Sequence, residues 1–203
     1  MVGLIMKMIL LLLISLIPLA QSPQNLVIIG DSLTEGYGVS FEQSYPYLLE
    51  QKLKKSGKNW KVTNHGISGS TTASAPARVR WIMKNPPDLV VLALGANDGL
   101  RGFKPEATEK NLNEAIQLLK QKNIKVLLAA MKMPPNYKGG SFAQKFEDLY
   151  PALAKKNHVP LIPFILEGVA GRPDMNQKDG IHPNVKGHEV IAETLFKSIS
   201  GHL

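Results

Sequence analysis

The 203-residue chain is 44% hydrophobic and 20% charged, which is typical of one globular domain and excludes a disordered chain. It contains no cysteine, and this excludes thiol catalysis, disulfide bridges and thiolate metal sites. The formal net charge is +8, but the lysines are scattered and no aromatic residues alternate with them. We therefore expect no nucleic-acid partner; a weak contact with an anionic membrane surface explains the surplus charge better.

The N-terminus has the parts of an export signal. Lys7 precedes the apolar run Met8–Ala20, and polar residues follow from Gln21. The run is shorter than the 20 or so residues of a comfortable membrane span. Residues 1–22 are predicted to be a signal peptide or an uncleaved N-terminal anchor, and the protein is predicted to be exported, periplasmic or secreted. Because no cysteine follows the run, a lipoprotein anchor is excluded.

After the leader, short β-branched runs alternate with longer amphipathic segments. Strands are expected at Leu26–Ile29, Trp60–Asn64, Leu89–Leu94, Lys125–Ala130 and Val159–Phe164. Helices are expected at Tyr45–Lys55, Thr72–Lys84, from Pro105 onward, at Phe142–Lys156 and at Val185–Ile199. This alternation predicts an α/β fold, a three-layer α/β/α sandwich with a five-stranded parallel, flavodoxin-like sheet, over residues 25–200. We expect the strand order 2-1-3-4-5.

Polar or turn-forming residues follow four of the expected strands directly. They are Ser32 after the first, Gly66–Gly69 after the second, Asn97 after the third and Met133-Pro134-Pro135 after the fourth. Ligands bind at the carboxyl ends of strands in open α/β sheets, so we expect these segments to form one site.

Ser32 is the candidate nucleophile of that site. It belongs to the tetrad Gly30-Asp31-Ser32-Leu33, where a strand ends and a helical turn can begin. A serine in such a place is also a common helix N-cap, so the tetrad alone is a weak signal. The segment is not the G-x-S-x-G elbow, because position 34 is threonine, and this disfavours an α/β-hydrolase fold.

A serine hydroxyl needs a base, and His182 is the best candidate among five histidines. Asp179 stands three residues before it in Asp179-Gly180-Ile181-His182, and a carboxylate there can fix the imidazole tautomer. Turn formation by Asp-Gly and His-Pro is the competing explanation. His65 is a rival near the sheet edge that we interpret as structural.

Acyl transfer also requires donors for the oxyanion. The backbone N–H groups of Ser32 and Gly69 and the side-chain amide of Asn97 are the candidates. A metal site is the chemical alternative, since Asp31, Asp98, Asp179 and His182 could converge. No paired-ligand spacing supports it, so no metal is expected.

Four blocks of the chain together resemble the SGNH (GDSL) hydrolases. They are Gly30-Asp31-Ser32-Leu33, Gly66-Ile67-Ser68-Gly69, Gly95-Ala96-Asn97-Asp98 and Asp179-Gly180-Ile181-His182, in the family's order. The stretches Asn97–Phe103 and Pro134–Tyr137 are similar to the bacterial thioesterase I, lysophospholipase L1 and arylesterase subgroup, and Ser70 departs from the aspartate frequent there. The resemblance implies an esterase that hydrolyses acyl esters, thioesters or lysophospholipids and needs no cofactor.

The substrate's acyl chain is expected to lie along Leu100, Phe103, Pro135 and Tyr137. Two alternatives remain at this point. One is a carbohydrate-ester deacetylase on the same fold, and the other is a non-catalytic lipid- or glycan-binding module. We expect a monomer.

Overall fold

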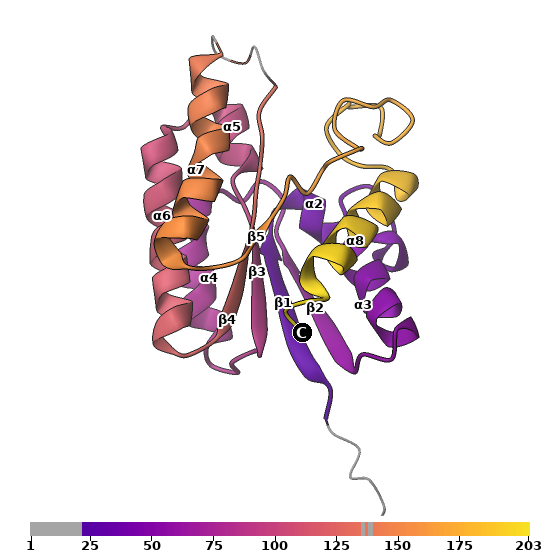
Figure 1. Ribbon diagram of the computed structural model, residues 1–203. Helices are drawn as coiled ribbons and strands as arrows, with labels where there is room; N and C mark the ends of the chain where they lie inside the picture. The colour runs from indigo at the N-terminus through magenta and orange to yellow at the C-terminus, as the bar shows by residue number, and fades with distance from the viewer. Residues whose placement is uncertain (1–21, 135–136, 138–139) are drawn as a thin grey trace, which may run out of the picture.

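The computed structural model describes residues 22–134, 137 and 140–203 (Figure 1). It contains one sheet of five parallel strands in the order β2-β1-β3-β4-β5, as expected. The strands are β1 (Gln24–Gly30), β2 (Trp60–Gly66), β3 (Leu89–Ala93), β4 (Lys125–Ala129) and β5 (Leu161–Ile162). Residues 1–21, which hold nearly all of the predicted leader, and the substrate-binding candidate Pro135 lie outside the described residues.

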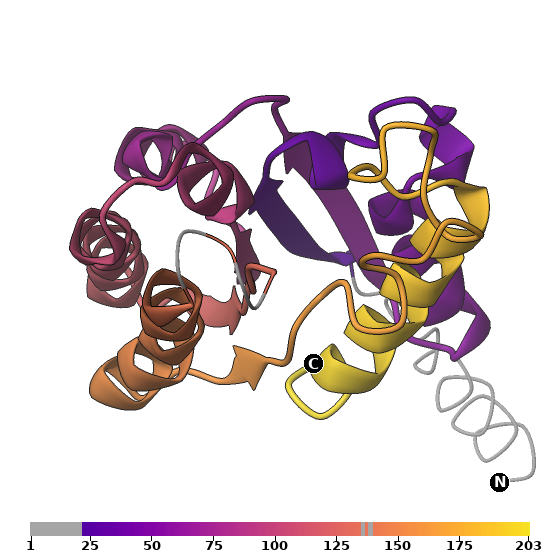
Figure 2. The same cartoon turned by 90° about the horizontal axis from the view of Figure 1, so that it is seen from above.

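Helices cover both faces of the sheet. The helices of the described residues are α2 (Ser32–Glu35), α3 (Tyr45–Lys55), α4 (Ala75–Ile82), α5 (Ala96–Arg101), α6 (Pro105–Gln121), α7 (Ser141–Asn157) and α8 (Val185–Ile199), together with the 3-10 turns η1 (Phe41–Gln43) and η2 (Thr72–Ser74). Helices α4, α6 and α7 lie on one face and α3 and α8 on the other, and the view from above shows the three layers (Figure 2). The expected α/β/α sandwich is confirmed.

The burial pattern explains this arrangement. All five residues of β3 are buried, as is typical of a central parallel strand covered on both faces. Helix α6 turns one stripe toward the sheet, with Leu112, Ile116 and Leu119 fully buried. Within the described part of the chain, no helix is long and apolar enough to span a membrane.

Two expected elements differ most in the structure: the helix after the second strand, which has a proline in its first turn, and the fifth strand, which has a proline on each side. The expected helix at residues 72–84 is a 3-10 turn followed by α4, whose first turn contains Pro76, and α4 ends at Ile82. The fifth strand is expected at Val159–Phe164 but contains only Leu161 and Ile162. Pro160 and Pro163 flank it, and neither has an N–H group for hydrogen bonding to the neighbouring strand.

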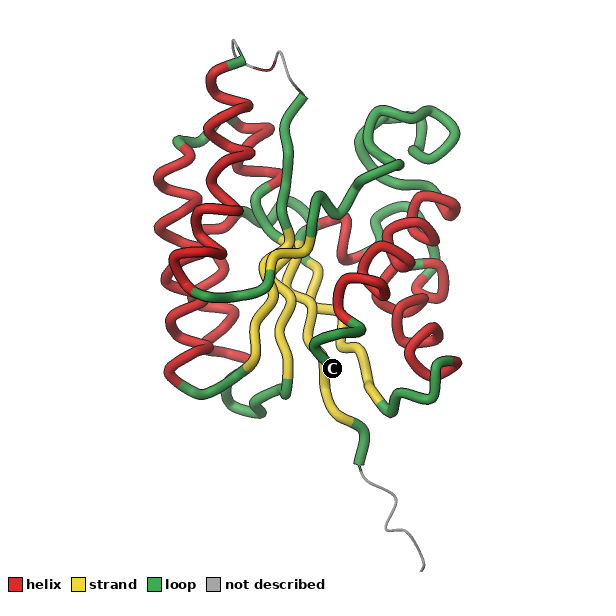
Figure 3. Tube along the Cα trace, viewed as in Figure 1, coloured by secondary structure: helices red, strands yellow, loops and turns green. Residues whose placement is uncertain are grey.

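The carboxyl ends of the strands lie at one edge of the molecule, and the long loop 163–184 between β5 and α8 reaches that edge (Figure 3). In the register of the sheet, Gly30 lies between Gly66 of β2 and Ala93 of β3. The absence of a side chain at Gly66 permits α2 to pack closely, since a Cβ atom there would lie 2.0 Å from the Glu35 backbone nitrogen. The end of β1, α2 and the end of β2 therefore form one compact unit.

Candidate active site

Ser32 is the first residue of the four-residue helix α2, directly after β1. Asp31 is its N-cap, and the Asp31 Oδ1 atom accepts a hydrogen bond from the Leu33 N–H at 3.1 Å. The Ser32 side chain is half-buried. The expected junction of a strand end with a helical turn is therefore present.

The loop before α8 brings His182 to Ser32. The His182 Nε2 atom lies 3.0 Å from the Ser32 Oγ atom, and the His182 Nδ1 atom lies 2.6 Å from Asp179 Oδ2. An ionised carboxylate can only accept, so Nδ1 of the neutral ring carries the hydrogen, and Nε2 is left to accept the Ser32 hydroxyl proton. This arrangement can deprotonate a serine during nucleophilic attack.

Asp179 is held in its ionised form. Its Oδ1 atom accepts the backbone N–H groups of Ile181 at 2.9 Å and of His182 at 3.0 Å. The His182 backbone N–H, the His182 ring and the Ile181 N–H lower the pKa of Asp179 to about 2. The tight turn expected from the sequence is present, and it also orients the carboxylate toward the imidazole.

The three candidate oxyanion donors come from neighbouring elements. The N–H groups of Ser32 and Gly69 take part in none of the backbone hydrogen bonds found among the described residues. The Asn97 Nδ2 atom donates to the Ser70 carbonyl at 3.0 Å, which uses one of its two hydrogens. All three groups therefore retain a hydrogen for a further acceptor.

Apolar side chains are exposed beyond Asn97. Leu100 is 40% and Phe103 44% exposed, and the Tyr137 hydroxyl donates to the Leu100 carbonyl. The structure thus brings Tyr137 and Leu100 together. Phe103 follows α5, and its backbone N–H donates to the Asp98 carbonyl at 2.9 Å.

The other histidines have different surroundings. The His65 ring packs against Trp81 with centroids 5.3 Å apart, and burial lowers its pKa. His188 is fully buried in α8, where its Nδ1 atom accepts the Tyr45 N–H at 3.2 Å. Among the described residues, no three His, Asp or Glu side chains converge as a metal site would require.

Sequence reasoning missed several residues that contact the site. The Tyr37 ring lies against His182, with centroids 4.6 Å apart. Glu35 accepts the Ser68 N–H at 2.7 Å, and Arg101 donates to the Gly69 carbonyl at 3.0 Å. Sequence proximity to Ser32 and Asn97 was the only available signal, because these contacts depend on how loops meet in space.

Comparisons with known proteins show the family of this chain. Residues 28–190 match the GDSL-like lipase/acylhydrolase family. An arylesterase from Vibrio mimicus is 40% identical over 185 residues, covering 91% of this chain and 92% of that protein. Thioesterase 1/protease 1/lysophospholipase L1 from Escherichia coli K12 is 39% identical over 181 residues, covering 89% and 85%. The crystal structure of TesA matches with a TM-score of 0.85 at 36% identity, covering 89% of this chain and 100% of that one.

The five-stranded parallel sheet and these matches define a hydrolase of the SGNH type. The chain belongs to the GDSL-like lipase/acylhydrolase family, and it is a carboxylic ester hydrolase that acts on small-molecule esters.

Proposed function

We propose that Ser32 is the nucleophile, His182 the general base and Asp179 the residue that orients the imidazole. The observation that carries this proposal is the continuous hydrogen-bonded chain from Ser32 through His182 to Asp179, at 3.0 and 2.6 Å. His182 takes the Ser32 proton as the Oγ atom attacks the acyl carbonyl, and it then gives that proton to the leaving group. Water activated by His182 hydrolyses the acyl-Ser32 ester and restores the free enzyme.

The oxyanion that forms on attack is stabilised by the Ser32 N–H, the Gly69 N–H and the Asn97 amide. The hydrogens that these three groups retain support this role. Loss of one such donor in comparable enzymes reduces turnover by about 10²–10³-fold.

The substrates are acyl esters and acyl thioesters, including aryl esters and lysophospholipids. Two observations support this range: the relatives bear arylesterase, thioesterase and lysophospholipase names, and apolar side chains lie exposed beyond Asn97. The acyl chain lies along Leu100, Phe103 and Tyr137. An exposed apolar surface of this kind favours a hydrocarbon chain over the sugar of a carbohydrate ester.

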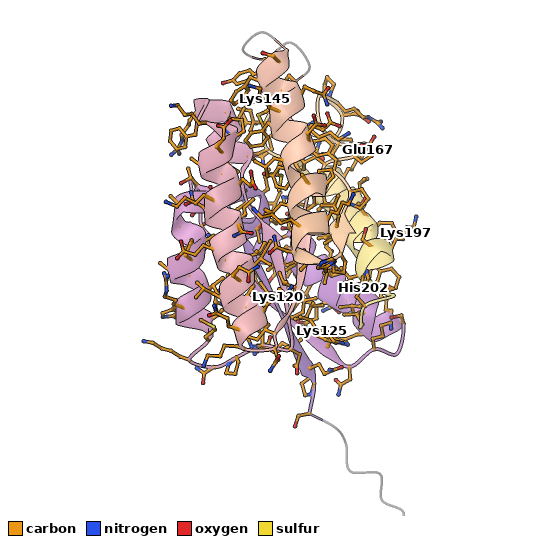
Figure 4. The ribbon with its side chains drawn as sticks, turned by 60° about the vertical axis from the view of Figure 1, so that its left-hand side comes forward. Lys120, Lys125, Lys145, Glu167, Lys197 and His202 are labelled. Carbon is orange, nitrogen blue, oxygen red and sulfur yellow. The ribbon has the colours of Figure 1, made fainter. Side chains whose placement is uncertain are left out.

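The protein is exported and acts as a monomer with weak affinity for anionic membrane surfaces. The leader-like pattern in residues 1–22 supports export. Side chains protect the edge strand β2 against pairing, since Val62 N–H bonds to Glu50 and Gly66 N–H bonds to Asn64, each at 2.8 Å. Basic residues such as Lys120, Lys145 and Lys197 are spread over different helices, which suits diffuse attraction rather than one binding patch (Figure 4).

The test is hydrolysis of p-nitrophenyl esters from acetyl to palmitoyl by the wild-type protein and its Ser32→Ala variant. We expect kcat to fall by about 10⁴-fold or more in the variant on every ester that the wild type cleaves. Ser198→Ala in α8 is the matched control and keeps full activity. Wild-type turnover in Ser32→Ala would overturn the serine mechanism, and activity confined to the acetyl ester would favour a deacetylase.

A further inference from the structure

The turn at residues 67–70 presents the Gly69 N–H, yet little of it is buried. Ile67 is 54% exposed, and Ser68 and Gly69 are exposed as well. The Ser70 N–H donates to the Ile67 carbonyl at 3.1 Å, and Gly69 has φ +75°. A glycine with positive φ at the third position is the signature of a type II β-turn. Packing therefore does little to fix this turn, and its hydrogen bonds must do so.

The central peptide of the turn joins Ser68 to Gly69 and contains the proposed oxyanion donor. The place of this N–H relative to Ser32 depends on where the turn as a whole lies. A shift or tilt of residues 67–70 would move the Gly69 N–H away from the oxyanion. Glycine adds freedom within the turn, because it adopts both signs of φ readily.

Glu35 fixes the peptide on one side of this central unit. It is the last residue of α2, the helix that begins at Ser32. Its Oε2 atom accepts the Ser68 backbone N–H at 2.7 Å and also the Ser68 hydroxyl. One carboxylate thus ties the turn to the helix of the nucleophile.

Arg101 fixes the peptide on the other side. It is the last residue of α5, which also contains Asn97, and its guanidinium donates to the Gly69 carbonyl at 3.0 Å. Asn97 itself donates to the Ser70 carbonyl at 3.0 Å. The two peptides that flank the Ser68–Gly69 peptide are therefore both held, one from each of the helices that provide the other oxyanion donors.

We propose that Glu35 and Arg101 are positioning residues that hold the Gly69 N–H toward the oxyanion by fixing the turn at residues 67–70 to α2 and α5. The proposal rests on the function proposed above for this site. Both side chains are exposed, and exposed charged contacts contribute little to folding stability. Their loss should therefore reduce turnover without unfolding the protein.

The test compares Glu35→Ala, Glu35→Gln, Arg101→Met and Arg101→Lys with the wild type, using p-nitrophenyl butyrate. We expect kcat to fall about 5- to 20-fold in Glu35→Ala and Arg101→Met, below the effect of losing a donor outright, with KM changed less than about twofold. Affinity for a trifluoromethyl ketone, which mimics the tetrahedral adduct, should weaken by the same factor as kcat/KM. Glu35→Gln keeps a hydrogen-bond acceptor and Arg101→Lys keeps a donor, so each should recover most of the loss.

Glu42→Ala and Arg80→Met, which alter an exposed glutamate and an exposed arginine away from the turn, are matched controls. The proposal is overturned if Glu35→Ala and Arg101→Met keep wild-type kcat. It is also overturned if Glu35→Gln is more active than the wild type, since a pure charge effect predicts that result. A large fall in Tm with unchanged inhibitor affinity would indicate a structural role instead. Failure of the wild type to cleave the ester would contradict the proposed function and is distinguishable from all of these results.

Discussion

Asp31, the residue before Ser32, is a buried carboxylate without a full set of partners. It is 1% exposed; its Oδ1 atom accepts the Leu33 N–H, whereas its Oδ2 atom has no hydrogen-bond partner among the described residues. Burial raises the pKa of Asp31 from 3.8 to about 6, although the Leu33 N–H and the charge of Arg78 oppose the rise. Keeping this group ionised at neutral pH costs roughly 3 kcal/mol.

Replacement of Asp31 by asparagine should therefore stabilise the fold at neutral pH. Asparagine is also a good N-cap, so its oxygen can still accept the Leu33 N–H. The buried amide loses part of the gain because its own hydrogens need acceptors. We expect urea unfolding at pH 7.5 to show a gain of about 1–2 kcal/mol for Asp31→Asn. A loss of stability at that pH would show that the carboxylate has a favourable partner.

At the scale of elements, the junction of β3 with α5 depends on Gly95. This glycine is the N-cap of α5 and has φ +124°, a conformation that side chains disfavour. A Cβ atom there would lie 2.0 Å from the hydroxyl of Tyr150, which is fully buried and donates to the Leu94 carbonyl at 3.0 Å. A side chain at Gly95 would therefore cause both backbone strain and a steric clash, at the start of the helix that positions Asn97.

Gly95→Ala should be strongly destabilising, by about 3 kcal/mol or more in urea unfolding, because both effects act together. Gly57→Ala is the matched control. Gly57 has φ +77°, and no atom lies within 4 Å of the place that a Cβ atom would take, so backbone strain of about 1 kcal/mol acts alone there. Equal losses in the two variants would contradict the steric argument.

Some of these elements and contacts could be predicted from the sequence, and others could not. The meeting of Ser32, His182 and Asp179 could be predicted because parallel strands end at one edge and the motifs follow those ends. The strand order 2-1-3-4-5 is also observed, but it is expected only as the order of a flavodoxin-like sheet and does not follow from the alternation of strands and helices. The short β5 could have been anticipated from Pro160 and Pro163. The contacts of Glu35 and Arg101 could not, because a carboxylate at the end of α2 finds Ser68 only after two loops have packed.

At the scale of the whole molecule, a chain of polar contacts links α8 to the helix that begins at Ser32. His188 accepts the Tyr45 N–H at 3.2 Å, and the Tyr45 hydroxyl lies 2.6 Å from the Thr34 hydroxyl in α2. His188 must be neutral to accept this hydrogen bond, which places its hydrogen on Nε2, an atom without a partner among the described residues. Burial lowers the pKa of His188 from 6.5 to about 4.

His188 and Asp31 make the stability of the protein respond to pH in opposite directions. The folded-state pKa of His188 is depressed, so the unfolded state takes up a proton before the folded state does. The free energy of unfolding therefore decreases by about 3 kcal/mol as the pH falls from 6.5 to 4. The folded-state pKa of Asp31 is raised, so here the folded state takes up a proton first. The free energy of unfolding therefore increases by about 2 kcal/mol as the pH falls from 6 toward 4.

The wild type should consequently lose only about 1 kcal/mol between pH 7 and pH 4, because the two titrations largely offset each other. Asp31→Asn removes one of them, and its free energy of unfolding should fall by about 3 kcal/mol over the same interval. Adding His188→Asn, whose amide oxygen can still accept the Tyr45 N–H, should flatten the profile again at a lower absolute stability. Urea unfolding at pH 4, 5, 6 and 7 measures all three profiles. Parallel curves for the wild type and Asp31→Asn would show that the two buried groups do not titrate in opposition.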